Sequence, residues 1–181
     1  MPRKLRLATC SLAGCFGCHM SFLDLDERLS ELLDYVELDR SPLTDIKQLA
    51  DSGVDIGLVE GGVCNTDNVQ VLREFRQRCT TLVAVGACAL TGGIPALRNH
   101  YTASACLQEA YGQGVSLASP QLPDDPELPL LLDKVYPIHE LVTVDYVLPG
   151  CPPPAEAFLE LLSALHEGRP PQLDYPLRRF D

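Results

Sequence analysis

The amino-acid sequence predicts an α/β fold in which crossover helices connect the strands of a parallel sheet. Three segments are strand-like, residues 4–9, 54–60 and 80–85, and the last two are directly followed by glycine. Helical patterns separate them, so the order is strand, helix, strand, helix, strand. Parallel strands require such long connections, which favours a parallel sheet. The length of 181 residues fits one domain.

The first third of the chain begins with a strand and a tight loop. Residues 4–9 alternate in polarity, and the stretch 14–17 carries two glycines. Residues 19–33 are predicted to be helical, with a strand at 35–38 and a short helix at 45–51. The helical prediction for 19–33 rests on apolar residues at helical spacing, namely Phe22, Leu25, Leu29, Leu32 and Leu33.

The middle of the chain continues the alternation. Residues 54–60 are apolar enough for a buried strand, and residues 65–78 have the spacing of a helix. Residues 80–85 predict the third clear strand. Residues 103–111 are compatible with a further helix.

The last third combines a loop, a strand and a helix. Residues 119–129 contain four prolines and three acidic residues, which predicts a rigid acidic surface loop. Residues 142–148 predict a last strand. Residues 155–166 have helical apolar spacing and predict a closing helix.

Composition and charge exclude several classes of protein. Hydrophobic residues make up 46% and charged residues 22%, as in ordinary globular chains. No apolar run approaches about 18 residues, and the start MPRKLRLATC has neither a signal core nor a twin-arginine pair. We therefore expect a cytoplasmic protein without membrane contact. The net charge of -11 disfavours nucleic acid as a partner.

Cysteine content is the unusual feature of the composition. Eight cysteines in this chain are about 4% of the residues, too few for a disulfide scaffold. In a reducing compartment, clustered cysteines indicate metal binding or redox chemistry.

Four of the cysteines follow predicted strands. Cys15 and Cys18 form a C-x-x-C in the loop after the first strand, although this spacing alone is a weak signal. Cys88 lies shortly after Gly86, and Cys151 directly follows Gly150. The carboxyl ends of parallel strands share one edge of a sheet, where ligands bind. The four thiols are therefore predicted to line one pocket.

Four thiolates suit either a structural zinc ion or a 4Fe-4S cluster. Zinc ribbons normally contain two local C-x-x-C pairs, whereas this chain has one pair and two distant single cysteines. The neighbouring glycines would also let backbone amides approach cluster sulfurs. An iron–sulfur cluster is favoured, and a zinc-stabilised interaction module remains the alternative.

Four ordered motifs carry a resemblance to a known family. They are LAGCFGCHMS at 12–21, VEGGVCN at 59–65, GACA at 86–89 with GGIPA at 92–96, and PGCPP at 149–153. In this order the motifs resemble those of small subunits of nickel–iron hydrogenases, in particular the soluble NAD-reducing (bidirectional) type.

The resemblance implies one flavodoxin-like domain over residues 1–181, an open parallel sheet with helices on both faces. It implies that Cys15, Cys18, Cys88 and Cys151 hold one 4Fe-4S cluster, the proximal cluster, and that this chain has no catalytic residue of its own. The implied partners are a large subunit with the nickel–iron centre and diaphorase subunits with iron–sulfur clusters, FMN and NAD. The chain would relay electrons from hydrogen oxidation towards NAD.

Related enzyme types remain as alternatives. Coenzyme-coupled and sulfur-reducing hydrogenases have similar short subunits, whereas membrane-bound enzymes add a second domain. The related respiratory complex I subunit has an adjacent Cys-Cys pair, which this chain lacks. A flavin-binding relative is a further hypothesis, but two cysteines occupy the loop where a Ser/Thr-rich phosphate cradle would lie. No G-x-G-x-x-G or Walker lysine supports NAD or ATP binding.

The remaining polar and sulfur side chains have simpler interpretations. We expect Cys10, Cys79 and Cys106 to pack in the core. Cys64 is expected in the core, or otherwise near the cluster or in an interface. Glu60 is expected to be solvated, with proton movement or partner contact as the alternative. His19 is expected to expose its ring at a helix start, with donation to a cluster sulfur or to the partner as the alternative.

Two expectations concern surfaces. Met20, Phe22 and Leu23 form an apolar stripe. We expect these side chains to pack in the core and at an interface rather than to bind a cofactor. The edge that carries the cysteines must adjoin another protein, so the isolated chain should expose an apolar patch.

Overall fold

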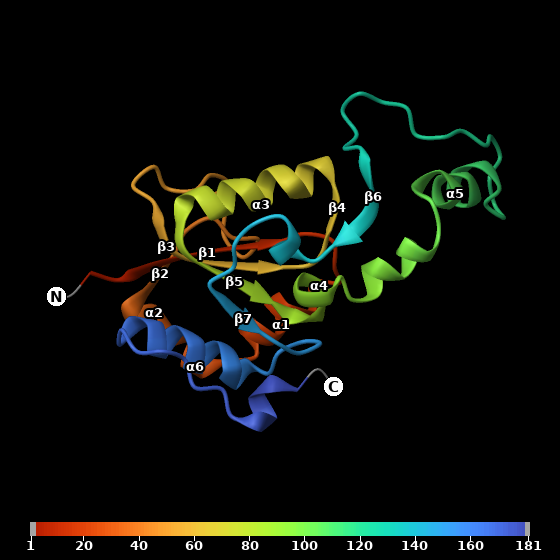
Figure 1. Cartoon of the computed structure of the whole chain (residues 1–181). Helices are drawn as coiled ribbons and strands as arrows, with labels where there is room; N and C mark the ends of the chain where they lie inside the picture. Colours follow the sequence, from red (N-terminus) through yellow and green to blue (C-terminus); the bar gives the residue numbers. More distant parts are fainter. Residues whose placement is uncertain (1–2, 180–181) are drawn as a thin grey trace.

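A five-stranded parallel sheet forms the centre of the computed structural model, which describes residues 3–179 (Figure 1). The strand order is β2-β1-β3-β5-β7, and all neighbouring strands are parallel. Counted among themselves, these strands have the order 2-1-3-4-5 of the flavodoxin-like fold. The predicted fold class is therefore confirmed. The strands are β1 (Leu5–Ser11), β2 (Val36–Leu38), β3 (Val54–Glu60), β5 (Cys79–Val85) and β7 (Tyr146–Leu148).

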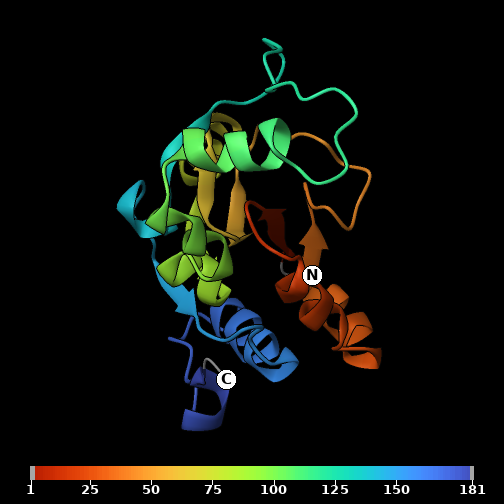
Figure 2. The same cartoon turned by 90° about the vertical axis from the view of Figure 1, so that its right-hand side faces the viewer.

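Helices cover both faces of the sheet. On one face lie α1 (Gly17–Leu23), α2 (Glu27–Tyr35) and α6 (Ala155–His166), which Figure 2 shows grouped together. The other face is covered by α3 (Thr66–Arg78). Alternate strand residues point to opposite faces, so Leu58 packs with the α1, α2 and α6 side while Val59 packs with the α3 side.

Shorter elements lie around the carboxyl edge and beyond it. They include a two-stranded antiparallel sheet that no pattern in the sequence indicated, because its strands are short and mostly not buried. Within residues 3–179, no helix has the length and apolar character needed to cross a membrane. The shorter elements are β4 (Val63–Asn65), α4 (Gly86–Thr91), η1 (Ile94–His100), α5 (Ala103–Leu107), η2 (Gln108–Gly112), β6 (Leu131–Tyr136), η3 (Ile138–Glu140) and η4 (Tyr175–Arg178).

Three predicted elements differ from the structure. The single helix over 19–33 is wrong, because the backbone of Asp26 takes a φ of 51° and separates α1 from α2. No helix forms over 45–51, since the Asp39 carboxylate accepts the backbone N–H of Arg40 and of Ala50 and holds this segment as a loop. The last strand begins at Tyr146 rather than at residue 142.

The other predicted elements are confirmed with small shifts of their bounds. The helix over 155–166 has the predicted bounds, and that over 65–78 starts one residue later because Asn65 caps it. The segment 103–111 is α5 continued by the π-helical η2. Residues 119–129 form an exposed loop without helix or strand.

The chain after α6 is tied back to that helix through Glu160. The Arg169 guanidinium donates to both carboxylate oxygens of Glu160 at 2.6 and 3.0 Å, and the Gln172 N–H donates at 2.9 Å. These hydrogen bonds, the one from Arg169 foremost, lower the pKa of Glu160 to about 2. The carboxylate thus stays ionised over the physiological range.

Replacing this carboxylate should have a pH-dependent cost. Because the folded pKa is depressed below the ordinary 4.5, the stabilisation is fully present above that value and is lost as the pH falls towards about 2. We expect Glu160→Gln to lower the free energy of unfolding by up to about 1 kcal/mol near neutral pH. The difference from the wild type should shrink at about pH 3 in denaturant titrations.

Glu167→Gln is the matched control, since Glu167 is more exposed and accepts only from Arg169 Nε. Its expected effect is smaller at every pH. An equal Glu160→Gln effect at both pH values would refute this account of the C-terminal segment.

Candidate functional site

Three loops bring four cysteines together at the carboxyl edge of the sheet. Cys15 follows β1 and Cys18 lies in the first turn of α1, while Cys88 lies in α4 after β5 and Cys151 follows β7. All four line the same cavity of about 60 Å³. Cys15 and Cys151 are exposed, and Cys18 and Cys88 are half-buried. Residues far apart in sequence therefore meet at the place that the strand pattern indicated.

The backbone around this cavity leaves space for the sulfur atoms. Gly86 has a φ of 80°, and a Cβ there would collide with Cys18 Sγ. A Cβ at Gly93, whose φ is 51°, would lie 2.7 Å from Cys88 Sγ. Side chains at either position would displace a thiol, so both glycines are required by the site.

The four cysteines that line the cavity have the chemistry of a metal-binding donor set. Four cysteine thiolates are the usual ligands of a 4Fe-4S cluster, in which each sulfur binds a different iron. Four thiolates are also the donor set of a structural zinc site.

The electrostatics of the cavity do not favour a nucleophilic cysteine. Burial and the nearby Glu60 carboxylate raise the pKa of Cys18, and burial raises that of Cys88. No lysine or arginine lines the cavity. Reactive cysteines occupy electropositive surroundings that lower their pKa. These thiols are instead suited to lose their protons on binding a metal.

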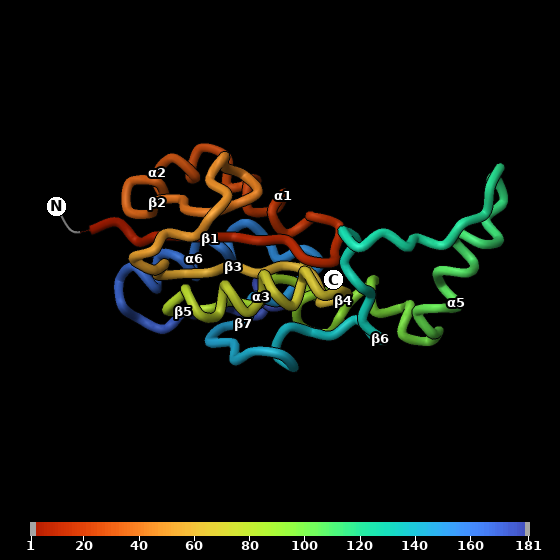
Figure 3. Tube along the Cα trace, turned by 90° about the horizontal axis from the view of Figure 1, so that it is seen from above, coloured from red at the N-terminus to blue at the C-terminus, as the bar shows by residue number. Residues whose placement is uncertain are grey.

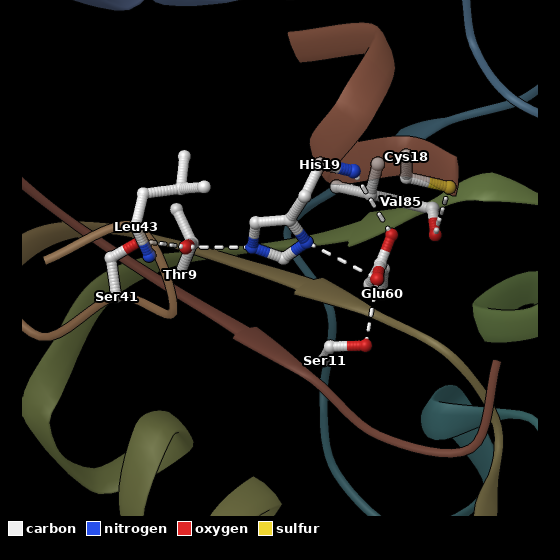
Figure 4. Close-up of polar contacts among 8 residues, drawn as sticks. All are labelled: Thr9, Ser11, Cys18, His19, Ser41, Leu43, Glu60 and Val85. Carbon is white, nitrogen blue, oxygen red and sulfur yellow. Dashed lines mark hydrogen bonds and ion pairs between the residues drawn. The ribbon is translucent and has the colours of Figure 1, made fainter. Parts of the chain in front are cut away.

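A cluster of polar side chains, all buried except the half-buried Ser11, adjoins the cysteine cavity at Cys18 and Glu60. Figure 4 shows its contacts. We call it the buried polar cluster, and its residues are Thr9, Ser11, His19, Ser41 and Glu60. His19 Nε2 lies 2.8 Å from Thr9 Oγ1, which in turn lies 2.6 Å from Ser41 Oγ. His19 Nδ1 is 3.2 Å from Glu60 Oε1, an ion-pair distance without hydrogen-bond alignment.

Glu60 joins β1, β3 and α1. Its carboxylate accepts the Ser11 hydroxyl at 2.7 Å and the backbone N–H of His19 at 3.2 Å. Burial alone would raise the pKa of Glu60, but its contacts with His19 and the hydrogen bond from Ser11 outweigh burial and lower it. The anionic form of Glu60 therefore fixes the loop that carries Cys15 and Cys18.

Two sequence expectations about these side chains are wrong. Glu60 is not solvated, because it is only 3% exposed. His19 does not expose its ring, because the ring is buried and stacks on Phe16 with centroids 4.6 Å apart. Both ring nitrogens face other members of the buried polar cluster, so neither is directed at a sulfur.

Thr9, Ser11 and Ser41 were not predicted as members of this cluster. A signal was present, since one predicted strand ends with the polar Thr9 and another with Glu60. Polar side chains in a buried strand need partners, because an unpaired buried polar group is costly.

The other cysteines lie away from the cavity. Cys10 and Cys79 are buried in the core on the α3 side, as predicted, and burial raises the pKa of Cys79 to about 12. Cys106 is half-buried on α5 and belongs to neither core, so the core prediction for it is wrong. The reason is that α5 lies off the sheet. Cys64 Sγ donates to the Asn68 side chain at 3.3 Å near the start of α3.

The predicted apolar stripe on α1 divides between the core and the surface. Phe22 is buried against the sheet and α6, and Leu23 is half-buried. Met20 is 54% exposed. The stripe therefore supplies a core residue and an apolar surface residue close in sequence to Cys18.

Comparison with known proteins identifies the relatives of this chain. Residues 15–165 match the family described as the 20 kDa subunit of NADH ubiquinone oxidoreductase. The chain is 46% identical to the delta subunit of the NAD-reducing hydrogenase HoxS of Cupriavidus necator, across 98% of this chain and 86% of that one. It is 38% identical to a subunit of the F420-non-reducing hydrogenase vhu of Methanococcus voltae. This match covers 96% of the present chain but only 60% of the relative.

Solved structures agree with these relatives. The fold superposes on a chain of a crystal structure of an NAD⁺-reducing [NiFe]-hydrogenase in the H₂-reduced state with a TM-score of 0.95 and 54% identity. That match covers 99% of this chain and 100% of the other. A [NiFeSe]-hydrogenase of Dm. baculatum, 18% identical with a TM-score of 0.61, shares the fold.

Proposed function

Because the chain belongs to the NADH ubiquinone oxidoreductase 20 kDa subunit family and matches chains of NAD-reducing hydrogenases over nearly its whole length, we propose that it is the electron-transfer small subunit of a nickel–iron hydrogenase. The observation that carries this proposal is the meeting of four cysteines from three loops around one cavity. The final electron acceptor would be NAD.

Cys15, Cys18, Cys88 and Cys151 would hold one 4Fe-4S cluster. A bound cluster of this kind accepts and releases one electron at a time. The four thiols would lose their protons on binding, and Gly86 and Gly93 keep side chains away from two of the sulfurs. Glu60 and His19 would hold α1 and with it the C-x-x-C loop in place. No residue of this chain acts as a general acid, base or nucleophile in this proposal.

The catalytic centre would lie in a partner chain. A large subunit with the nickel–iron site would split hydrogen, and diaphorase subunits with iron–sulfur clusters, FMN and NAD would receive the electrons. The NAD-reducing type is supported by sequence identity, which is 46% to the Cupriavidus subunit and 38% to the Methanococcus one. We place the enzyme in the cytoplasm, where the NAD pool is available.

Metal and sulfide analysis of the copurified small and large subunits tests the proposal. We expect about four acid-labile sulfides, as one 4Fe-4S cluster requires, about four irons in addition to the iron of the nickel–iron centre, and broad brown absorption. A colourless complex that contains zinc without labile sulfide would support the zinc-stabilised module instead. A structured yellow spectrum would support a flavin-binding relative. Either result would overturn the proposal.

A further inference from the structure

A long segment between Cys88 and Cys151 extends away from the sheet without a core of its own. We call residues 93–134 the arm, and Figures 1 and 3 show it projecting beyond the carboxyl edge. No residue of the arm is fully buried, although it contains η1, α5 and η2. Isolated helices this short are not stable in water by themselves. The arm therefore depends on contacts outside itself.

The base of the arm is held in one orientation by polar side chains. Arg98 donates to the backbone oxygen of Leu132 at 2.8 Å. Asn99 forms a pair of hydrogen bonds with the backbone of Val135, at 2.9 and 2.7 Å. These contacts attach η1 to β6 and use the polar side of η1 for that purpose.

Apolar side chains remain exposed on η1 and at Tyr101, which directly follows it. Ile94, Leu97 and Tyr101, which we call the arm stripe, are 72%, 60% and 67% exposed. Residues three apart lie on the same side of a 3₁₀-helix, so Ile94 and Leu97 are neighbours. A rigidly held row of exposed apolar side chains is typical of a protein interface.

The arm stripe is continuous with the cysteine edge. Only Gly92 and Gly93 separate η1 from α4, the helix that contains Cys88, and Gly93 packs against Cys88. A partner that covers the cysteine cavity therefore meets η1 next.

The arm is acidic. It carries five acidic residues and two basic ones, and one of the basic side chains, Arg98, already donates to backbone oxygens.

We propose that the arm is a second contact with the large hydrogenase subunit, which would receive the arm stripe on an apolar surface bordered by basic side chains. This inference rests on the proposed function, since it assigns the arm to the partner that covers the cysteine edge. The large subunit would thus order the arm and lengthen its own interface with the small subunit. Under this assignment, neither a diaphorase subunit nor a second copy of this chain binds the arm stripe.

Site-specific photo-crosslinking in the complete complex tests the assignment. A photoreactive phenylalanine analogue replaces Tyr101, and the same analogue at Leu33 is the control. Leu33 is partly exposed on α2, and its backbone oxygen accepts from Lys4 beside the amino end of β1, at the opposite end of the strand from the cysteines. We expect the analogue at position 101 to crosslink to the large subunit and that at position 33 not to do so.

Crosslinking from position 101 to a diaphorase subunit, to another small subunit or to no chain would overturn the inference. A wild-type small subunit that does not copurify with a large subunit would instead overturn the proposed function. The two failures are therefore distinguishable.

A binding measurement gives an independent readout. The double substitution Leu97→Ser and Tyr101→Ser should weaken the association of small and large subunits about tenfold or more. The cluster's paramagnetic signal should stay unchanged, which shows that the variant still folds around its cysteines. Unchanged affinity in a variant that keeps this signal would contradict the inference.

Discussion

Replacing Cys18 with serine is expected to abolish hydrogen-dependent NAD reduction by the complex. Cys18 lies in the first turn of α1, is less exposed than Cys15 and Cys151, and has its Sγ close to Gly86. Loss of residues that merely support a metal ligand costs about 10- to 100-fold in activity or metal affinity. Loss of a ligand should therefore reduce activity by roughly 100-fold or more, measured as NADH formation under hydrogen.

Cys106→Ser and Cys64→Ser are the matched controls for this experiment. Both thiols are half-buried, and neither lines the cysteine cavity. Each variant should keep at least about half of the wild-type rate, since surface changes usually alter stability by less than about 0.5 kcal/mol. If Cys18→Ser retains activity while a control loses it, the assignment of the ligands is wrong.

Replacing Glu60 with alanine is expected to lower the free energy of unfolding by about 3–5 kcal/mol. The substitution leaves the buried His19 N–H and the half-buried Ser11 hydroxyl without their acceptor. It also removes the carboxylate oxygen that lies 3.2 Å from His19 Nδ1. A buried group that loses its partner costs far more than an exposed ion pair does, which is why the effect is large.

Glu60→Gln separates the contribution of the side chain's shape to stability from the contribution of its charge. The amide keeps one oxygen acceptor and similar volume, so we expect a smaller loss than for alanine, measured by denaturant unfolding followed by circular dichroism. Cluster content should fall together with stability in Glu60→Ala, because the same carboxylate fixes the first turn of α1. A change below about 0.5 kcal/mol in Glu60→Ala would refute the proposed role of the buried polar cluster.

The sheet and the meeting of the four cysteines could be predicted from sequence because both follow from the order of elements. Strands such as 54–60 are mostly apolar, and the carboxyl ends of parallel strands share an edge. Glycines beside Cys88 and Cys151 then marked the loops that approach a ligand. The four ordered motifs added the identity of the family, which strand order alone does not provide.

The remaining features depend on tertiary contacts that no local pattern contains. The division of α1 from α2 depends on the backbone of Asp26, while the helical spacing of apolar residues continues through it. The burial of His19 and Glu60 depends on Thr9, Ser11 and Ser41, which lie on other segments. The arm could not be predicted from the sequence for a different reason. It has no core of its own, so its sequence has little of the apolar periodicity by which helices are recognised.

Electron paramagnetic resonance of the small and large subunits under hydrogen tests the central claim most directly. In the wild-type complex, we predict that hydrogen produces the signal of a reduced 4Fe-4S cluster, and that Cys18→Ser removes this signal while Cys106→Ser retains it. A wild-type complex that takes up hydrogen without any such signal, or a signal that persists in Cys18→Ser, would contradict the claim that these cysteines hold the cluster of an electron-transfer subunit.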